Sequence, residues 1–525
     1  MPYFLASILS AFLLTIAWPT NGYAVPIFFA FVPIFIVQEW MLKQPSVYFF
    51  VFSFLCFLLW NLFTTWWIYN ASIGGAVMAI LANSILMALV FSIFHSIKKQ
   101  LNASVFIVIP LWLAFEYLHL NWDISWPWLT LGNVFSENHK WIQWYEFTGV
   151  LGGSFWILLI NCVVYNWIVS ASKKLASQWA AIAILLLVAP LVFSFYLYEK
   201  YAKHESNDSI QVSIIQPNID PYNEKFGGLS NLDQLNKLVV LAKPTLDSTT
   251  DYLIAPETAI ASNIWENKLA SSPEVNSLKL FLENYPKLKL IIGASTAKAY
   301  TTDEKVSETA RKFTDEDAYY DAYNTAIQID NTANIQIYHK SKLVPGVEKI
   351  PFPILFKPLE KVAIDLGGTS GSLGIQGDRT VFLASNSKSK IAPVICYESI
   401  YGEFVSQYVK NGANFIFIIT NDGWWGDTPG YRQHFSYAKL RAIETRRYIA
   451  RSANTGTSGI INSRGDCLSK TNYWTEAFLK GTLLSGTELT FYVRHGDYLG
   501  WFSALASLGL LLFYFIQKIT KPEKL

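Results

Sequence analysis

Pro393-Val394-Ile395-Cys396-Tyr397-Glu398 places a cysteine where a short apolar run gives way to polar residues. Such a run predicts a buried strand that leads into a turn. A cysteine at that point suits a nucleophile, because α/β folds gather their reactive groups where strands end. The alternative is a buried structural thiol, since free cysteines are among the most buried side chains.

Two further segments place charged residues after predicted strands. Ala255-Pro256-Glu257-Thr258 follows the run Tyr252-Leu253-Ile254, and Tyr338-His339-Lys340-Ser341-Lys342 follows Ile335–Tyr338. Taken alone, Glu257 could be an exposed loop residue and Lys340 a surface lysine, because most charged side chains are exposed.

Together the three segments predict acyl-transfer chemistry. Attack by a thiol on an acyl group needs a base for the thiol proton and a donor for the oxyanion. Glu257 would be the base, Cys396 the nucleophile, and Lys340 the positive donor. The backbone N–H of Tyr397, the residue after the nucleophile, would be a second oxyanion donor.

The surrounding sequence predicts an α/β domain. β-rich runs alternate with helical stretches at Asn231–Ala242 and Tyr437–Ala450. The charged stretch Thr301–Asp317 lacks apolar periodicity and is interpreted as a surface insertion. The predicted strands are Ile210–Ile215, Tyr252–Ala255, Leu288–Gly293, Thr325–Ile329, Ile335–Tyr338, Ala392–Ile395 and Phe415–Thr420.

The composition indicates a membrane protein. Of 525 residues, 52% are hydrophobic and 15% are charged, whereas soluble domains have about 25% charged residues. The net charge of +2 does not favour nucleic acid as a partner. Eight apolar spans are predicted, at Phe4–Trp18, Tyr23–Val37, Val47–Trp67, Gly75–Phe94, Ala103–Leu118, Gly149–Val169, Trp179–Tyr198 and Tyr498–Ile516.

These spans divide the chain into three parts. Residues 1–199 form a transmembrane domain of about seven spans, 200–490 a catalytic domain, and 491–525 a last span with a cytoplasmic tail. The first two spans are short for a bilayer that needs about 20 residues, so they could be tilted or re-entrant. A cleaved signal peptide ending near Ala24 is less favoured, because no basic residue precedes the first run and more spans follow at once.

Loop charges predict the orientation. Lysines follow the second, fourth, sixth and last spans, whereas the alternate loops hold little positive charge. The positive-inside rule therefore places both termini in the cytoplasm and the catalytic domain outside, which in a bacterium is the periplasm. The lysines concerned are Lys43, Lys98, Lys99, Lys173, Lys174, Lys518, Lys521 and Lys524.

The cysteines do not predict a disulfide framework or a metal site. Cys56 and Cys162 lie in apolar spans, and neither Cys396 nor Cys467 has a cysteine at a ligand-like spacing. We therefore expect no metal and no cofactor.

With their surroundings these segments resemble the Glu–Lys–Cys triad of the nitrilase superfamily, and with the preceding spans they resemble the apolipoprotein N-acyltransferase family. The resemblance covers nearly the whole chain. Further matching stretches include Trp126-Pro127-Trp128-Leu129, Gly153-Ser154-Phe155-Trp156, Gln216-Pro217-Asn218-Ile219, Tyr323-Asn324-Thr325-Ala326, Asn421-Asp422-Gly423-Trp424-Trp425-Gly426, Gln433-His434, Arg441-Ala442-Ile443-Glu444 and Arg494-His495-Gly496-Asp497.

The resemblance implies an αββα sandwich in the catalytic domain and a two-step acyl transfer in the bacterial inner membrane. Cys396 would take an acyl chain from a phospholipid such as phosphatidylethanolamine and form a thioester. The acceptor would be the N-terminal amine of a diacylated apolipoprotein. Glu348 and Glu398 match positions that support the site, with a solvated glutamate as the alternative for each.

The resemblance also implies contacts with substrate or lipid, by Phe226, Asn324, Trp424 and Trp425. The two tryptophans would line the acyl path or form a lid, unless they are ordinary core or interface aromatics. Phe226 stands where the family commonly has Trp, and Pro345-Gly346-Val347-Glu348 differs from the usual Pro-Phe-Gly-Glu. Glu116 matches a motif near a span end, where an intramembrane acid is a functional candidate or lies at the interface.

Two other functions compete with this expectation. A membrane-tethered amidase would use the same triad on a small amide. A non-catalytic scaffold could keep the fold, although Glu257, Lys340 and Cys396 are all present.

Overall fold

The protein is described by a computed structural model that covers residues 1–20, 22–203, 208–225, 227–350, 372–384 and 388–520. Two compact units are present. One comprises Met1–Lys200 with His495–Leu525, and the other comprises Tyr201–Arg494.

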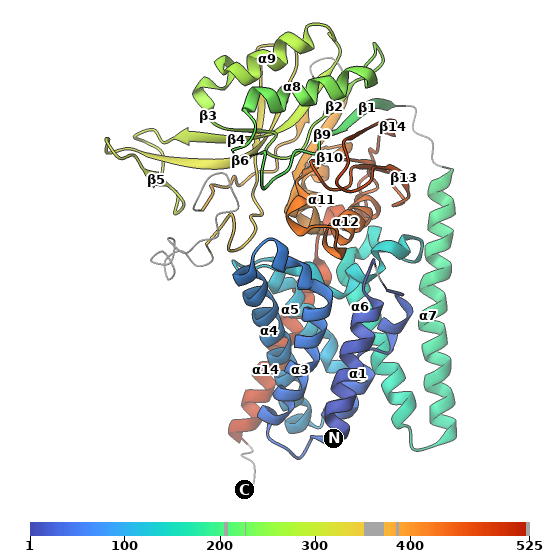
Figure 1. The fold of residues 1–525 in the computed structure, drawn as a ribbon. Coiled ribbons are helices and arrows are strands. Elements are labelled where there is room, and N and C mark those ends of the chain that lie inside the picture. Colours follow the sequence, from blue (N-terminus) through green and yellow to red (C-terminus); the bar gives the residue numbers. More distant parts are fainter. Residues whose placement is uncertain (21, 204–207, 226, 351–371, 385–387, 521–525) are drawn as a thin grey trace. The chain divides into compact units, whose positions relative to one another are not determined.

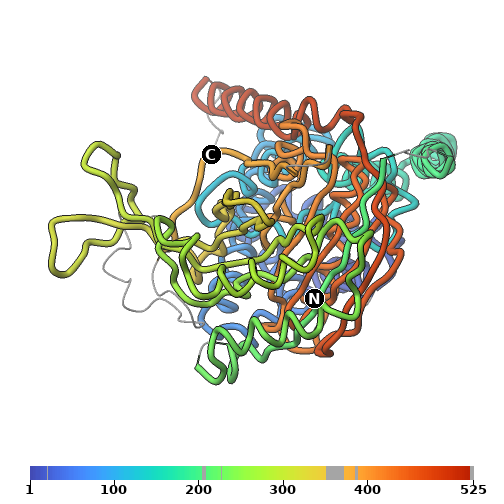
Figure 2. Tube along the Cα trace, turned by 90° about the horizontal axis from the view of Figure 1, so that it is seen from above, coloured from blue at the N-terminus to red at the C-terminus, as the bar shows by residue number. Residues whose placement is uncertain are grey.

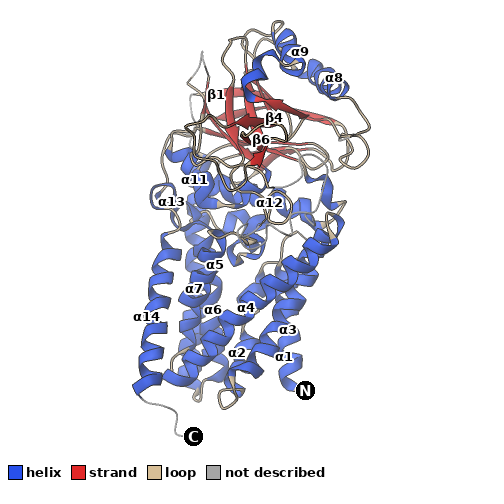
Figure 3. Ribbon diagram, turned by 90° about the vertical axis from the view of Figure 1, so that its left-hand side faces the viewer, coloured by secondary structure: helices blue, strands red, loops and turns tan. Residues whose placement is uncertain are grey.

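The first unit is helical, and each predicted span overlaps an α-helix (Figures 1 and 3). The spans of 23 to 30 residues are long and apolar enough to cross a membrane, whereas those that contain α1, α2 and α5 are shorter. The sequence predicted the shortness of the first two but not of α5. The helices are α1 (Pro2–Ala17), α2 (Val32–Trp40), α3 (Ser46–Thr65), α4 (Ile73–Leu101), α5 (Val108–Leu120), α6 (Tyr145–Val169), α7 (Lys173–Ala202) and α14 (Tyr498–Thr520).

Helix α7 stands beside the other helices of this unit, as Figures 1 and 2 show, and only 17% of its most apolar window is buried. Pro190 lies inside this helix and has no N–H to donate to the carbonyl of Leu186. The indole of Trp156 on α6 donates to that carbonyl instead, over 2.7 Å. This bond satisfies a backbone group that lipid could not satisfy.

Glu116 is buried within the first unit and hydrogen-bonded on both sides. It is 3% exposed and accepts from the Trp112 indole at 2.9 Å and from the Leu131 N–H at 2.8 Å. The carboxylate thereby joins α5 to the loop that follows it.

The second unit contains two sheets. The first has the order β14-β1-β2-β4-β6-β5, with β3 beside β4 and β7 beside β6; the second has the order β13-β12-β11-β10-β9-β8. The strands are β1 (Ser209–Gln216), β2 (Tyr252–Ile254), β3 (Ile260–Trp265), β4 (Lys289–Ala299), β5 (Arg311–Lys312), β6 (Tyr319–Ile329), β7 (Gln336–His339), β8 (Phe382–Leu383), β9 (Lys390–Ile395), β10 (Phe415–Thr420), β11 (Ile449–Ala453), β12 (Gly459–Ile461), β13 (Cys467–Lys470) and β14 (Ala477–Leu484).

Helices cover the outer faces of both sheets. Helices α8 (Asn231–Ala242) and α9 (Pro273–Leu282) bury their apolar faces on the first sheet, and α11 (Gly402–Lys410) and α12 (Pro429–Thr445) pack on the second (Figure 1). The sheets face each other, with the Tyr252 ring on β2 packed against Phe417 on β10. The expected combination of a helical membrane part and an αββα sandwich is confirmed.

The local predictions hold with one error. Every predicted strand and the helix Asn231–Ala242 are present, but the helix predicted at Tyr437–Ala450 is wrong at its end. Helix α12 stops at Thr445, where Arg446 takes a left-handed φ of 53°, and Ile449 and Ala450 belong to β11. Ile449 and Ala450 are apolar and buried. An apolar run suits a buried helix and a buried strand equally, so the hydrophobic pattern could not distinguish the two elements.

Candidate active site

Three strand ends bring the predicted triad together. Glu257 follows β2, Lys340 follows β7, and Cys396 follows β9. The Lys340 ammonium donates to Glu257 Oε1 at 3.0 Å, and the charges of both residues act on the Cys396 thiol. The exposed fractions are 6% for Glu257, 1% for Lys340 and 9% for Cys396, so the cluster is shielded from water.

Burial and neighbouring charges set the protonation states of Glu257, Lys340 and Cys396. Burial raises the pKa of Glu257, but Lys340 and the Asn324 amide lower it, so that it lies below its usual 4.5. Burial lowers the pKa of Lys340, but Glu257 and Glu348 raise it well above its usual value. Burial also raises the pKa of the Cys396 thiol, and the charge of Glu257 raises it further. At neutral pH the site therefore holds a carboxylate, an ammonium and a thiol, as a base-assisted nucleophile requires.

The backbone at Glu257 is tightly enclosed. A Cβ added to Gly293 on β4 would lie 2.3 Å from the Thr258 nitrogen, so only glycine allows this approach. Thr258 itself has a positive φ of 47°. The Lys225 ammonium donates to the Glu257 carbonyl at 3.1 Å and to Thr258 Oγ1 at 2.6 Å, which fixes this segment.

Lys225 is a site residue that the sequence reasoning missed. It is 3% exposed, and burial lowers its pKa to about 8, although Glu257 and Cys396 counteract that shift. Its neighbour Phe226, predicted to contact lipid, lies outside the described residues. A lysine in a polar loop carries no local sign of burial.

Asn324 and Glu348 complete a bonded cluster around Lys340. Asn324 Nδ2 donates to Glu257 Oε1 at 2.7 Å and to Glu348 Oε1 at 3.2 Å. Glu348 Oε1 accepts from Lys340 at 2.7 Å, and its Oε2 accepts from the Val344 N–H at 2.9 Å. Glu348 is therefore not a solvated loop residue.

Glu398 is fully buried and joins two of the strand ends. It accepts from the Tyr338 hydroxyl at 2.6 Å and from the N–H groups of Ser341 at 2.7 Å and Ile395 at 2.9 Å. Burial raises the pKa of Glu398 to about 7, even though these donors lower it. The contacts tie the segment that carries Lys340 to the turn that carries Cys396.

The turn at Cys396 is strained. Its φ of 49° is left-handed, and such a conformation costs a non-glycine residue roughly 1–3 kcal/mol. Tyr397, the next residue, is buried and packs its ring edge-on against Tyr401. A strained residue held by its surroundings is typical of a functional site.

The two tryptophans flank this region on the turn after β10. Trp424 and Trp425 are both half-buried. The Tyr222 ring packs against Trp424, and the Trp425 ring packs against His434 at 5.5 Å between centroids. Their contact with an acyl chain remains a prediction.

The chain is similar to known proteins over nearly its whole length. Residues 211–487 match the family model described as carbon-nitrogen hydrolase, and residues 10–163 match that of the apolipoprotein N-acyltransferase N-terminal domain. The apolipoprotein N-acyltransferase of Chlorobaculum tepidum is 29% identical over 509 residues, which cover 94% of this chain and 93% of the relative. That of Geobacter metallireducens is 27% identical over 518 residues, covering 95% and 92%.

A solved amidase from Nesterenkonia sp. is similar to part of this chain. It has 12% sequence identity and a TM-score of 0.35, and the match covers 55% of this chain and 94% of the amidase.

Proposed function

We propose that this chain, which belongs to the apolipoprotein N-acyltransferase family, moves an acyl chain from a phospholipid to the N-terminal amine of a diacylated apolipoprotein. The transfer would pass through a thioester on Cys396. The second half of the chain is a carbon–nitrogen hydrolase domain. The observation that carries the proposal is the buried contact between Lys340 and Glu257 at the strand end beside Cys396. The enzyme is an acyltransferase of the membrane.

In the first half-reaction the Glu257 carboxylate takes the thiol proton while sulfur attacks the ester carbon. The oxyanion is stabilised by the Lys340 ammonium and the Tyr397 N–H. An ammonium has three N–H groups, and among the described residues Lys340 uses one on Glu257 and one on Glu348. The third is available to the substrate. Collapse breaks the ester bond, and the lysophospholipid alkoxide leaves with the proton from Glu257.

In the second half-reaction the apolipoprotein amine attacks the thioester carbon. Glu257 takes a proton from the amine, the C–S bond breaks, and the Cys396 thiolate is reprotonated by Glu257. The product is an amide, and the enzyme returns to its starting state. Shielding of the cluster from water favours the amine over hydrolysis.

The proposal includes the bacterial inner membrane as the location and the periplasm as the compartment that the catalytic domain faces. The charge distribution supports it, because Lys98 and Lys99 end α4 and Lys518 lies in the last turn of α14. Phosphatidylethanolamine is the proposed donor, and the substrate contacts are Phe226, Asn324, Trp424 and Trp425.

The test uses the full chain in detergent with phosphatidylethanolamine labelled in its acyl chains. Intact mass spectrometry should show one acyl group on Cys396, and a diacylglyceryl-cysteine peptide should then remove it and gain an amide. C396A should abolish both steps, whereas C467A, at the half-buried cysteine of β13, should not. Cleavage of small amides without any acyl-enzyme formed from phospholipid would instead establish the membrane-tethered amidase.

A further inference from the structure

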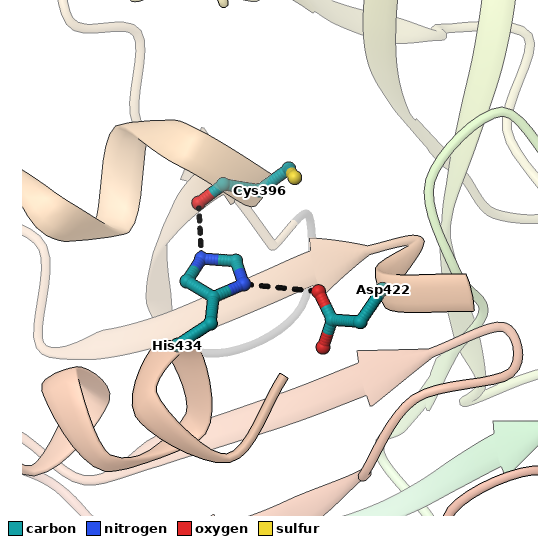
Figure 4. Close-up of side chains that lie close together, drawn as sticks. All are labelled: Cys396, Asp422 and His434. Carbon is teal, nitrogen blue, oxygen red and sulfur yellow. Dashed lines mark hydrogen bonds and ion pairs between the residues drawn. The ribbon is translucent and has the colours of Figure 1, made fainter. Parts of the chain in front are cut away.

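His434 lies directly under the turn that carries Cys396. It is fully buried on α12, and its Nε2 lies 3.2 Å from the Cys396 carbonyl oxygen and 3.1 Å from Ser399 Oγ (Figure 4). Neither half-reaction above uses this histidine.

The contacts of Nε2 show that this nitrogen carries a proton. The Ser399 hydroxyl donates its own hydrogen to the Cys396 carbonyl at 2.7 Å, so it can only accept from His434. The carbonyl oxygen can only accept as well. Nε2 therefore faces two acceptors and must be a donor.

The other ring nitrogen has a different environment. Nδ1 lies 2.9 Å from Asp422 Oδ1 and 3.0 Å from Arg451 Nη2, so it has a partner whether or not it is protonated. Burial lowers the pKa of His434, and the charge of Arg451 lowers it further. The role of Nε2 as a donor does not depend on the protonation of Nδ1, because Nε2 faces the same two acceptors in either form of the ring.

The histidine is anchored to the ends of neighbouring parallel strands. Asp422 follows β10, and its Oδ2 accepts from Arg451 on β11 at 2.6 Å, with both side chains fully buried. Asp422 Oδ1 also accepts from Thr420 at 2.8 Å. Because β9, β10 and β11 run parallel, their carboxyl ends meet at one sheet edge, where Cys396 also lies.

We propose that His434 is a positioning residue for the nucleophile: its Nε2–H and the Ser399 hydroxyl hold the Cys396 carbonyl and so fix the left-handed turn that aims the thiol. The Asp422–Arg451 pair holds the ring in place. This inference deepens the proposed function and rests on Cys396 being the nucleophile.

The geometry disfavours two other roles for His434, as a base and as a metal ligand. A histidine base would present an unprotonated nitrogen to the thiol, but Nε2 carries a hydrogen, and the Cys396 sulfur points away from the ring (Figure 4). Cys396, Asp422 and His434 also bring ligand-type atoms within 4.8 Å of one another. The Arg451 guanidinium beside Asp422 and His434 disfavours a further cation there.

A pair of amide substitutions tests the role. The amide of glutamine reaches the position of Nε2, whereas that of asparagine reaches only the position of Nδ1. We expect H434Q to acylate Cys396 within about fivefold of the unchanged enzyme and H434N to be slower by roughly 10- to 100-fold, as a misplacement of about 1 Å would cause. Single-turnover acylation by labelled phosphatidylethanolamine, followed by mass spectrometry, measures both rates.

A second readout does not depend on lipid. Alkylation of Cys396 by iodoacetamide, quantified on the Cys396 peptide, should follow the same order, with H434N slowest. The thermal midpoints of both variants show whether either loses its fold. If phospholipid never acylates Cys396 but the alkylation order holds, the proposed function fails and the positioning role stands.

Two results would overturn the inference. Equal losses in H434Q and H434N at equal thermal midpoints would mean that the Nε2 donor does not matter. Loss in H434Q of the acid limb of the pH–rate profile would mean that His434 is the base. If His434 only positions the turn, the acid limb of the H434Q profile stays at the pH set by the pKa of Glu257.

Discussion

The side-chain amide of Asn324 donates to Glu257 Oε1 over 2.7 Å, and the ammonium of Lys340 reaches the same oxygen over 3.0 Å. One oxygen of the candidate base thus accepts from both a neutral and a charged donor. Both donors favour the ionised form of the carboxyl. The pH dependence of the reaction should report this arrangement.

The first prediction concerns the acid limb of the unchanged enzyme. The folded-state pKa of Glu257 lies below its usual 4.5, so the carboxylate, which is the active form, persists as pH falls and is lost only below that value. We expect the Cys396 acylation rate to be constant from about pH 8 to about pH 5 and to fall below pH 4.5. Rapid-quench mass spectrometry measures the rate.

Thermal midpoints recorded at each pH provide the control, because the ionised Glu257 also contributes stability that is lost as pH falls through its lowered pKa. A rate that falls between pH 7 and pH 6 without any change in midpoint would contradict Glu257 as the base.

The second prediction is that N324D moves the acid limb to higher pH. It places a third carboxylate beside Glu257 and Glu348, and a like charge raises the pKa of its neighbour. We expect a shift of roughly one pH unit or more and a lower rate at neutral pH. N331D, at an exposed position of the turn after β6, is the matched control and should leave the profile unchanged.

The third prediction concerns Lys225. K225M removes the donors to the Glu257 carbonyl and to Thr258 Oγ1, and an unsatisfied buried acceptor costs about 1–3 kcal/mol. We expect a lower thermal midpoint and at least a tenfold slower acylation, because the base loses its fixed position. K237M changes a partly exposed lysine of α8 and should have neither effect. Full activity of K225M would show that Gly293 and the strand alone hold Glu257.

The fourth prediction concerns helix α7 and uses a double-mutant cycle. W156F should lower the thermal midpoint in detergent, because the Leu186 carbonyl loses its donor, at a cost of about 1–3 kcal/mol. P190A restores the N–H that the helix lacks at that carbonyl. In the P190A background, W156F should therefore lower the thermal midpoint clearly less. An equal cost in both backgrounds would mean that the indole contributes packing and not a hydrogen bond.

Local features of the sequence predicted the elements well. Apolar runs marked the helices of the first unit and seven strands of the second, because burial leaves a periodic pattern along the chain. The same patterns missed the other seven described strands, among them β14, whose exposed and partly buried residues alternate. They also extended α12 into β11, because apolar residues suit both elements.

The triad could be predicted because its residues follow elements that leave a local pattern in the sequence. Glu257, Lys340 and Cys396 each follow a strand, and a strand end is visible in the sequence. The support by Lys225 and His434 was not predicted, because each acts on a backbone carbonyl far along the chain, Glu257 and Cys396 respectively. Such bonds use ordinary side chains at no characteristic spacing.

The sequence by itself determined the helical spans, seven of the fourteen described strands and the three reactive residue types at strand ends. Only the tertiary structure decided that Lys340 reaches Glu257 from 83 residues away and that the buried His434 contacts the Cys396 carbonyl. The physical reason is that hydrophobic periodicity is encoded between near neighbours, whereas strand order and parallel pairing bring the distant strand ends to one edge.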